Sequence, residues 1–117
     1  MKILKLTEGK VFDMGPGNTR RIVGKNVGAK HLTLNYAVFQ PYQEFKQHSH
    51  ARSEDVIVVL KGKGVIKLGD RKVDIQEGDV IYVPPGEQHG TIAGNKEMVL
   101  ISVQAPPDLD LYKGTYK

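Results

Sequence analysis

Two histidines separated by a single residue, His48 and His50, occur in a chain that has only four histidines in 117 residues. In a β-strand, residues i and i+2 point to the same side, with their Cα atoms about 7 Å apart. Two imidazoles placed in this way can bind one metal ion through their ring nitrogens. The chain has no cysteine, so any metal site must be built from nitrogen and oxygen ligands.

Further ligands follow this pair along the chain. Glu54 and Asp55 come after the short connection Ala51-Arg52-Ser53, and a hairpin there would return a carboxylate beside the imidazoles. Adjacent strand residues face opposite ways, so only one of the two carboxylates can point toward the histidines. A third imidazole, His89, follows an apolar run and a rigid Pro-Pro-Gly turn, and a barrel could bring it back to the first two.

The elements that must position these residues are short strands. Apolar or alternating runs rich in Val and Ile recur between glycine, proline and asparagine, which is typical of strands separated by turns. The predicted strands are Ile3–Leu6, Leu32–Phe39, Glu44–His50, Val56–Leu60, Val65–Leu68, Val73–Ile75, Val80–Val83, His89–Ile92 and Met98–Gln104. Gly69-Asp70 and Gly94-Asn95 are typical of hairpins. No window has a helical period, so the sequence predicts an all-β antiparallel barrel or sandwich.

The ends of the chain are less regular. Residues 8–30 hold five glycines and a proline, and we expect an irregular segment with one short strand at Arg21–Val23. We expect a single domain over residues 1–117, with a core at about 30–105 and a loosely attached tail at 106–117. Glycines within the core, among them Gly64 and Gly90, are interpreted as turn residues.

Residues 42–62 and 78–95 resemble the two motifs of the cupin superfamily, small metal-binding β-barrels of the jelly-roll (double-stranded β-helix) type. The first motif reads Gly, five residues, His-x-His, three or four residues, Glu, six residues, Gly, and this chain supplies His48, His50 and Gly62. The second reads Gly, five residues, Pro-x-Gly, two residues, His, three residues, Asn, and Gly78, Pro84, Gly86 and His89 match it. Fifteen residues separate Gly62 from Gly78, which resembles the spacing of compact single-domain members.

The chain departs from the family pattern at three positions. Tyr42 replaces the first glycine, and Ala93 stands where asparagine is common. The motif spacing of six intervening residues before Gly62 gives Asp55 as the fourth ligand, whereas three intervening residues after His50 give Glu54. We favour Asp55, with Glu54 as the alternative. Aspartate is one methylene shorter, so its bond to a metal could be long, water-mediated or absent.

The resemblance implies one divalent transition metal, Mn, Fe, Co, Ni, Cu or Zn, held by His48, His50, His89 and Asp55. It implies a metal-dependent enzyme, such as a dioxygenase, decarboxylase, isomerase or lyase, acting on a small carboxylate, keto acid or sugar. The alternative is a non-catalytic module that binds or senses such a molecule. No catalytic base is evident, because Lys46, which alternates with His48, is expected to be solvated.

The charge and composition of the chain limit the kinds of binding partner that we expect. The net charge of +4 comes from scattered basic residues without interleaved aromatics, so we expect no nucleic-acid binding. The longest apolar run, Val56 to Leu60, is far short of the roughly 20 residues of a membrane-spanning helix. We expect a cytoplasmic protein that binds a small molecule. We also expect a homodimer, because exposed sheet edges tend to pair with another chain.

Overall fold

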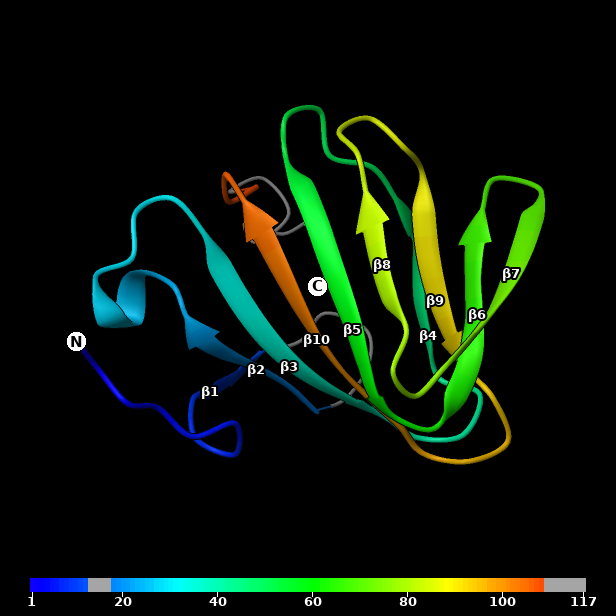
Figure 1. The fold of residues 1–117 in the computed structure, drawn as a ribbon, viewed down its shortest axis with the longest axis horizontal. Coiled ribbons are helices and arrows are strands. Elements are labelled where there is room, and N and C mark those ends of the chain that lie inside the picture. The colour runs from blue at the N-terminus through cyan, green and yellow to red at the C-terminus, as the bar shows by residue number, and fades with distance from the viewer. Residues whose placement is uncertain (13–17, 109–117) are drawn as a thin grey trace.

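The computed structural model describes residues 1–12 and 18–108, and its regular secondary structure is almost entirely antiparallel strand (Figure 1). The strands are β1 (Lys10–Phe12), β2 (Asn18–Val23), β3 (Thr33–Phe39), β4 (Glu44–His48), β5 (Glu54–Lys61), β6 (Lys63–Leu68), β7 (Arg71–Gln76), β8 (Val80–Val83), β9 (His89–Ala93) and β10 (Met98–Ala105). One 3-10 turn, Lys25–Val27, lies between β2 and β3. The predicted all-β class is confirmed. No helix of the described residues is long and apolar enough to cross a membrane.

Two antiparallel sheets form the jelly-roll sandwich that the sequence predicts. The larger sheet has the order β1-β2-β3-β10-β5-β8, and the smaller has the order β4-β9-β6-β7. Consecutive strands often lie in different sheets, as β4 and β5 do, and as β9 and β10 do. The chain therefore alternates between the two layers, which distinguishes this arrangement from a series of hairpins (Figure 1).

The core fills the space between the sheets. Its buried side chains come from both layers, with Val59, Ile66 and Met98 the largest that are fully buried. Alternation along the strand produces this arrangement, since β5 buries Ile57 and Val59 while Val56, Val58 and Leu60 face outward. One end of this inner space is polar, because β3 buries Thr33 and Asn35 there and β10 buries Gln104.

Several local predictions are wrong. Ile3–Leu6 forms no strand, while β1 and the first half of β2 lie in the segment expected to be irregular. The short strand expected at Arg21–Val23 is the second half of β2. The expected hairpin at Gly94-Asn95 instead connects β9 of the smaller sheet to β10 of the larger one. Gly69-Asp70 does join paired strands, β6 and β7. Gly64 and Gly90 lie within β6 and β9, where they permit close backbone approach, and are not turn residues.

Candidate metal centre

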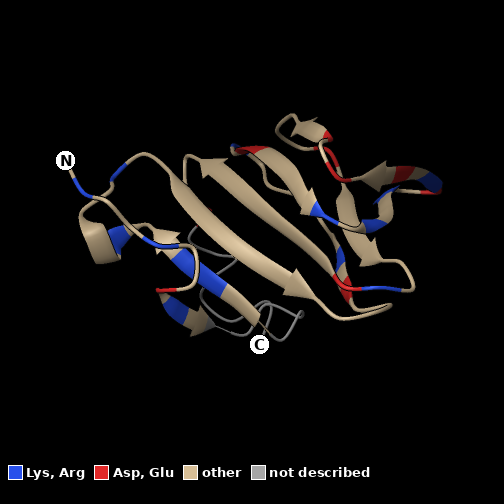
Figure 2. Cartoon of the chain, turned by 60° about the horizontal axis from the view of Figure 1, so that its bottom comes forward, with Lys and Arg blue, Asp and Glu red and all other residues tan. Residues whose placement is uncertain are grey.

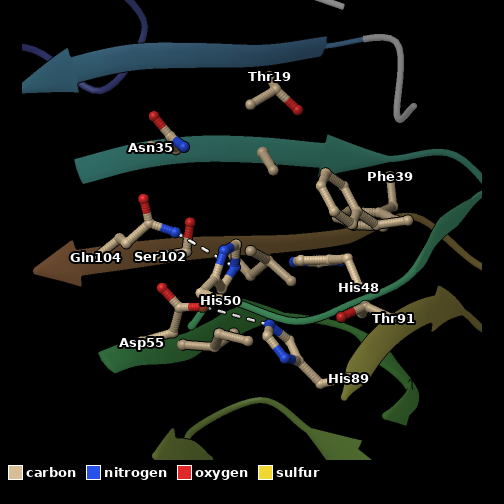
Figure 3. Close-up of a pocket in the computed structure, with 14 residues that line it drawn as sticks. Thr19, Asn35, Phe39, His48, His50, Asp55, His89, Thr91, Ser102 and Gln104 are labelled. Atoms are coloured by element: carbon tan, nitrogen blue, oxygen red, sulfur yellow. Dashed lines mark hydrogen bonds and ion pairs between the residues drawn. The ribbon is translucent and has the colours of Figure 1, made fainter. Parts of the chain in front are cut away.

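Three imidazoles meet at the polar end of the inner space (Figure 3). His48 is the last residue of β4 and His89 the first of β9, and the two are cross-strand partners with ring centroids 4.4 Å apart. His50 lies just beyond β4, with its ring centroid 4.8 Å from that of His48 and 5.5 Å from that of His89. One ring nitrogen from each histidine lies within 4.8 Å of the other two. The structure thus brings the three predicted histidines together.

Local backbone features place these rings. The pairing of β4 with β9 shifts register between Phe45 and His48, and both of these side chains line the same cavity. Strict alternation would have put Lys46 on the face of His48, but Lys46 is exposed, as expected for a solvated lysine. The Pro-Pro-Gly turn contributes a further link, because the backbone N–H of Gly86 donates to the carbonyl of His50 at 2.7 Å.

Each imidazole has an oxygen acceptor at its Nδ1 atom. The acceptors are the carbonyl of Lys46 for His48 at 2.8 Å, the carbonyl of Glu87 for His89 at 3.0 Å, and the Asp108 carboxylate for His50 at 2.7 Å. These contacts are hydrogen bonds only if Nδ1 carries the proton. In all three rings Nε2 is therefore the nitrogen left to act as a metal ligand, and metal-binding histidines are commonly oriented in this way.

The two candidate carboxylates point in opposite directions. Asp55 is buried, and its Oδ2 lies 3.2 Å from Nε2 of His50 and 3.3 Å from Nε2 of His89. Glu54 is exposed on the outer face of β5, where it accepts a hydrogen bond from the Tyr82 hydroxyl. Of the two, only Asp55 reaches the imidazoles.

The electrostatics of this cluster suit metal binding. Burial lowers the pKa of His48 to about 4, so this ring is neutral at pH 7. Burial alone would raise the pKa of Asp55, but its contacts with the His50 and His89 rings outweigh the effect of burial and lower the pKa to about 2. Burial opposes protonation of His50 too, but its contacts with Asp55 and Asp108 prevail and raise its pKa above 6.5. The Asp55 carboxylate is therefore ionised, and its negative charge lies among the three rings, where it would favour a bound cation.

A cavity of about 80 Å³ adjoins the cluster. Its apolar part is formed by Ala37, Phe39, Phe45, Ile57 and Leu100. The rest of the cavity is lined by neutral polar side chains that were not predicted from the sequence, which are Thr19, Asn35, Thr91, Ser102 and Gln104. The alternation of Thr33, Asn35, Ala37 and Phe39 could have identified Asn35, because Phe39 marks that face of β3 as the buried one.

The residues present fit a divalent transition metal. Three imidazole nitrogens and one carboxylate oxygen are ligands that Mn, Fe, Co, Ni, Cu and Zn all accept. Oxygen acceptors at all three Nδ1 atoms leave Nε2 for coordination, and Asp55 supplies a negative charge among the rings. The donor types do not select among these metals.

Comparison with known proteins agrees with this geometry. Residues 35–104 match the family described as Cupin domain. The matched range contains His48, His50, His89 and Asp55. Over 73 residues, 62% of this chain and 47% of the relative, the chain is 29% identical to a dimethylsulfoniopropionate lyase, DddW, of Ruegeria pomeroyi. The chain spans about half the length of the curated relatives it matches.

Solved structures show the same fold. The polyketide cyclase RemF from Streptomyces resistomycificus is similar, with a TM-score of 0.78 at 28% identity, over 92% of this chain and 80% of that one. A predicted oxalate decarboxylase from Thermotoga maritima has a TM-score of 0.78 at 19% identity, over 91% of this chain and all (100%) of that chain. With its match to the Cupin domain over residues 35–104, this chain belongs to the cupin superfamily.

Proposed function

We propose that this protein binds one divalent transition metal through His48, His50 and His89, with Asp55 as the fourth ligand. The observation that carries the proposal is the orientation of the three rings, each with an oxygen acceptor at Nδ1 and with Nε2 left for coordination. Asp55 is preferred to Glu54 because its Oδ2 is within 3.3 Å of two of the Nε2 atoms. Glu54 faces away from the cavity.

We further propose an enzyme that acts on a small oxygen-rich molecule. A bound metal with open coordination positions would act as a Lewis acid on a carboxylate, carbonyl or hydroxyl oxygen of the substrate. The chain itself would supply the pose. The backbone N–H of Asp108 donates to Oε1 of Gln104 at 2.6 Å, and Nε2 of Gln104 lies 3.3 Å from Nε2 of His50 beside the cavity. Once a metal takes Nε2 of His50, the Gln104 amide would donate instead to an oxygen of the bound molecule.

This site is compatible with dioxygenase, decarboxylase, isomerase and lyase reactions, since one fold supports many reactions. The dimethylsulfoniopropionate lyase, the polyketide cyclase and the predicted oxalate decarboxylase among the similar proteins support an enzyme without selecting its reaction.

A non-catalytic binding or sensing module is the second candidate, and the cavity lining favours it. Apart from the three histidines and Asp55, every described residue that lines the cavity is neutral. None of these is a lysine, glutamate or tyrosine that could serve as a separate general acid or base, so any chemistry depends on the metal and its ligands.

Elemental analysis of protein purified without a nickel column tests the metal site. We expect about one divalent metal ion per chain, and we expect a steep loss of metal after replacement of any one of the three histidines by alanine. A His48→Ala/His50→Ala protein that keeps full metal content would contradict the proposal. Turnover of keto acids, diols and sugars by protein loaded with Mn, Fe, Ni or Zn, compared with binding of the same compounds, separates the enzyme from the binding module.

The homodimer and the cytoplasmic location expected from the sequence also stay proposals. Support for a dimer comes from the outer face of the larger sheet, where two apolar rows cross the strands. One row is Tyr36, Ile101, Val58 and Val80, and the other is Leu34, Val103, Val56 and Tyr82. Figure 2 shows the middle of this sheet almost without charge, and Val80 and Tyr82 are 67% and 57% exposed. A second copy would bury this face.

A further inference from the structure

The chain that follows β10 turns back to the candidate metal centre. β10 ends beside the beginning of β5, where Ala105 pairs with Glu54. The Ser53 hydroxyl then donates to the carbonyl of Pro106 at 2.5 Å. Two residues later, Asp108 contacts both Gln104 and His50. Residues 106–108, which the sequence analysis assigned to a loose tail, are therefore attached at three points, and residues 109–117 lie outside the described part of the chain.

We infer that Asp108 is a positioning residue of the metal centre, whose carboxylate holds His50 in the ring orientation and tautomer that metal binding requires. The inference rests on the proposed metal site and adds to it a residue outside the ligand set. The contact joins Oδ2 of Asp108 to Nδ1 of His50 at 2.7 Å.

The orientation of His50 depends strongly on its Nδ1 contact. The other two rings depend less on their own Nδ1 contacts. His48 and His89 donate to carbonyls of Lys46 and Glu87, each two residues earlier in the chain and fixed by the local backbone. His50 lies beyond the end of β4, and its acceptor comes from a residue 58 positions away. A carboxylate is also the stronger acceptor, and second partners of this type raise the basicity of a ligating imidazole.

Asp108 is itself held in place. Its backbone N–H donates to Oε1 of Gln104 at 2.6 Å, and Gln104 is buried in β10. The Asp108 side chain is only 22% exposed, while that of His50 is 3% exposed. A carboxylate fixed through its own backbone and shielded from water can orient a partner, whereas an exposed ion pair contributes little.

The test compares Asp108→Ala, Asp108→Asn and a control, Asp74→Ala, which removes an exposed carboxylate from β7. The first readout is zinc affinity, measured by competition with a chromophoric chelator. We expect a loss of about 10- to 100-fold in Asp108→Ala, in line with other partners of metal ligands. We expect a smaller loss in Asp108→Asn, since its amide oxygen still accepts from Nδ1, and no change in Asp74→Ala.

The second readout needs no metal. Nitrogen-15 NMR of the histidine rings in metal-free protein, recorded above the raised pKa of His50 so that this ring is neutral, reports which of its nitrogens carries the proton, and a dispersed spectrum shows that each variant is folded. Wild type and Asp108→Asn should keep the proton on Nδ1, and Asp108→Ala should lose that preference. An Asp108→Ala protein with wild-type zinc affinity and an unchanged His50 ring would overturn the inference. If wild-type protein binds no zinc, the proposed function fails, while the ring spectra still decide the role of Asp108.

Discussion

Gly90→Ala should loosen the strand pairing that carries two of the three histidines. Gly90 is buried in β9 directly after His89. A Cβ at this position would lie 2.8 Å from the backbone N of Gln47, 2.9 Å from the carbonyl oxygen of Phe45 and 3.0 Å from Cα of Gln47. All three atoms belong to the backbone of β4 just before His48, so none can move aside by side-chain rotation.

The magnitude follows from this overlap. Ordinary contacts of a Cβ lie at 3.4–4 Å, so β4 and β9 must separate by several tenths of an ångström. Overpacking of a close-packed interior costs about 1–3 kcal/mol in stability. The separation falls between His48 and His89, which are cross-strand partners. If binding must close that gap again, the same energy opposes it, and about 1.4 kcal/mol corresponds to a tenfold loss of affinity.

Urea unfolding of metal-free protein and zinc competition titrations measure the two effects. Gly94→Ala is the matched control, because its Cβ would have a single close neighbour, the Lys63 carbonyl oxygen at 3.2 Å, away from the histidines. We expect Gly90→Ala to lose more stability and more zinc affinity than Gly94→Ala. Equal behaviour of the two variants would refute the idea that close approach of β4 and β9 sets the histidine geometry.

Three further predictions follow from the site and the outer sheet. Asp55→Ala should lower metal content more than Glu54→Ala, because only Asp55 of the two reaches the imidazoles. The opposite order in elemental analysis would show that Glu54, not Asp55, is the ligand. Light scattering at micromolar concentration should give the mass of a dimer, and Val80→Lys should shift it toward the monomer by placing a charge on the apolar face; a monomer mass for the wild type would exclude the dimer. In metal-free protein, burial lowers the pKa of His48 to about 4, below its unfolded value of 6.5. Between these two values the unfolded chain binds the proton more readily than the folded protein does, so His48 should lower the stability of the fold as pH falls from 6.5 to 4. Denaturation at several pH values in chelator should therefore find a smaller loss over that interval in His48→Gln than in wild type.

The central strands could be predicted because their residues carry the pattern locally. In β5, Val and Ile alternate between the core and the outer face, and the same β-branched enrichment identifies β8 and β10. The pattern fails near the N-terminus. The apolar alternation in Ile3–Leu6 has no partner strand, whereas the polar residues of β2 form a strand because β3 offers an edge to pair with. Pairing, a tertiary effect, decides these elements.

The candidate site divides in a similar way. The histidine spacing and the Pro-Pro-Gly turn are visible in the sequence, and the preference for Asp55 over Glu54 agrees with their orientation. The expected hairpin between His50 and the carboxylates is wrong, because β4 and β5 belong to different sheets. Nor does any local pattern distinguish Asp108, since its contact with His50 depends on how the chain turns after β10.

The position of β10 has a consequence for synthesis of the protein. β10 lies between β3 and β5, so the two halves of the larger sheet have no connection through hydrogen bonds until residues 98–105 are in place (Figure 1). A ribosome adds these residues after all the other described strands. Until then, β3 and β5 each present an unpaired edge, which is the kind of edge that recruits other chains. The edge of β5 is rich in Val, Ile and Leu, and that of β3 carries Leu34, Tyr36, Val38 and Phe39. A nascent chain stalled before Met98 should therefore be aggregation-prone and dependent on chaperones.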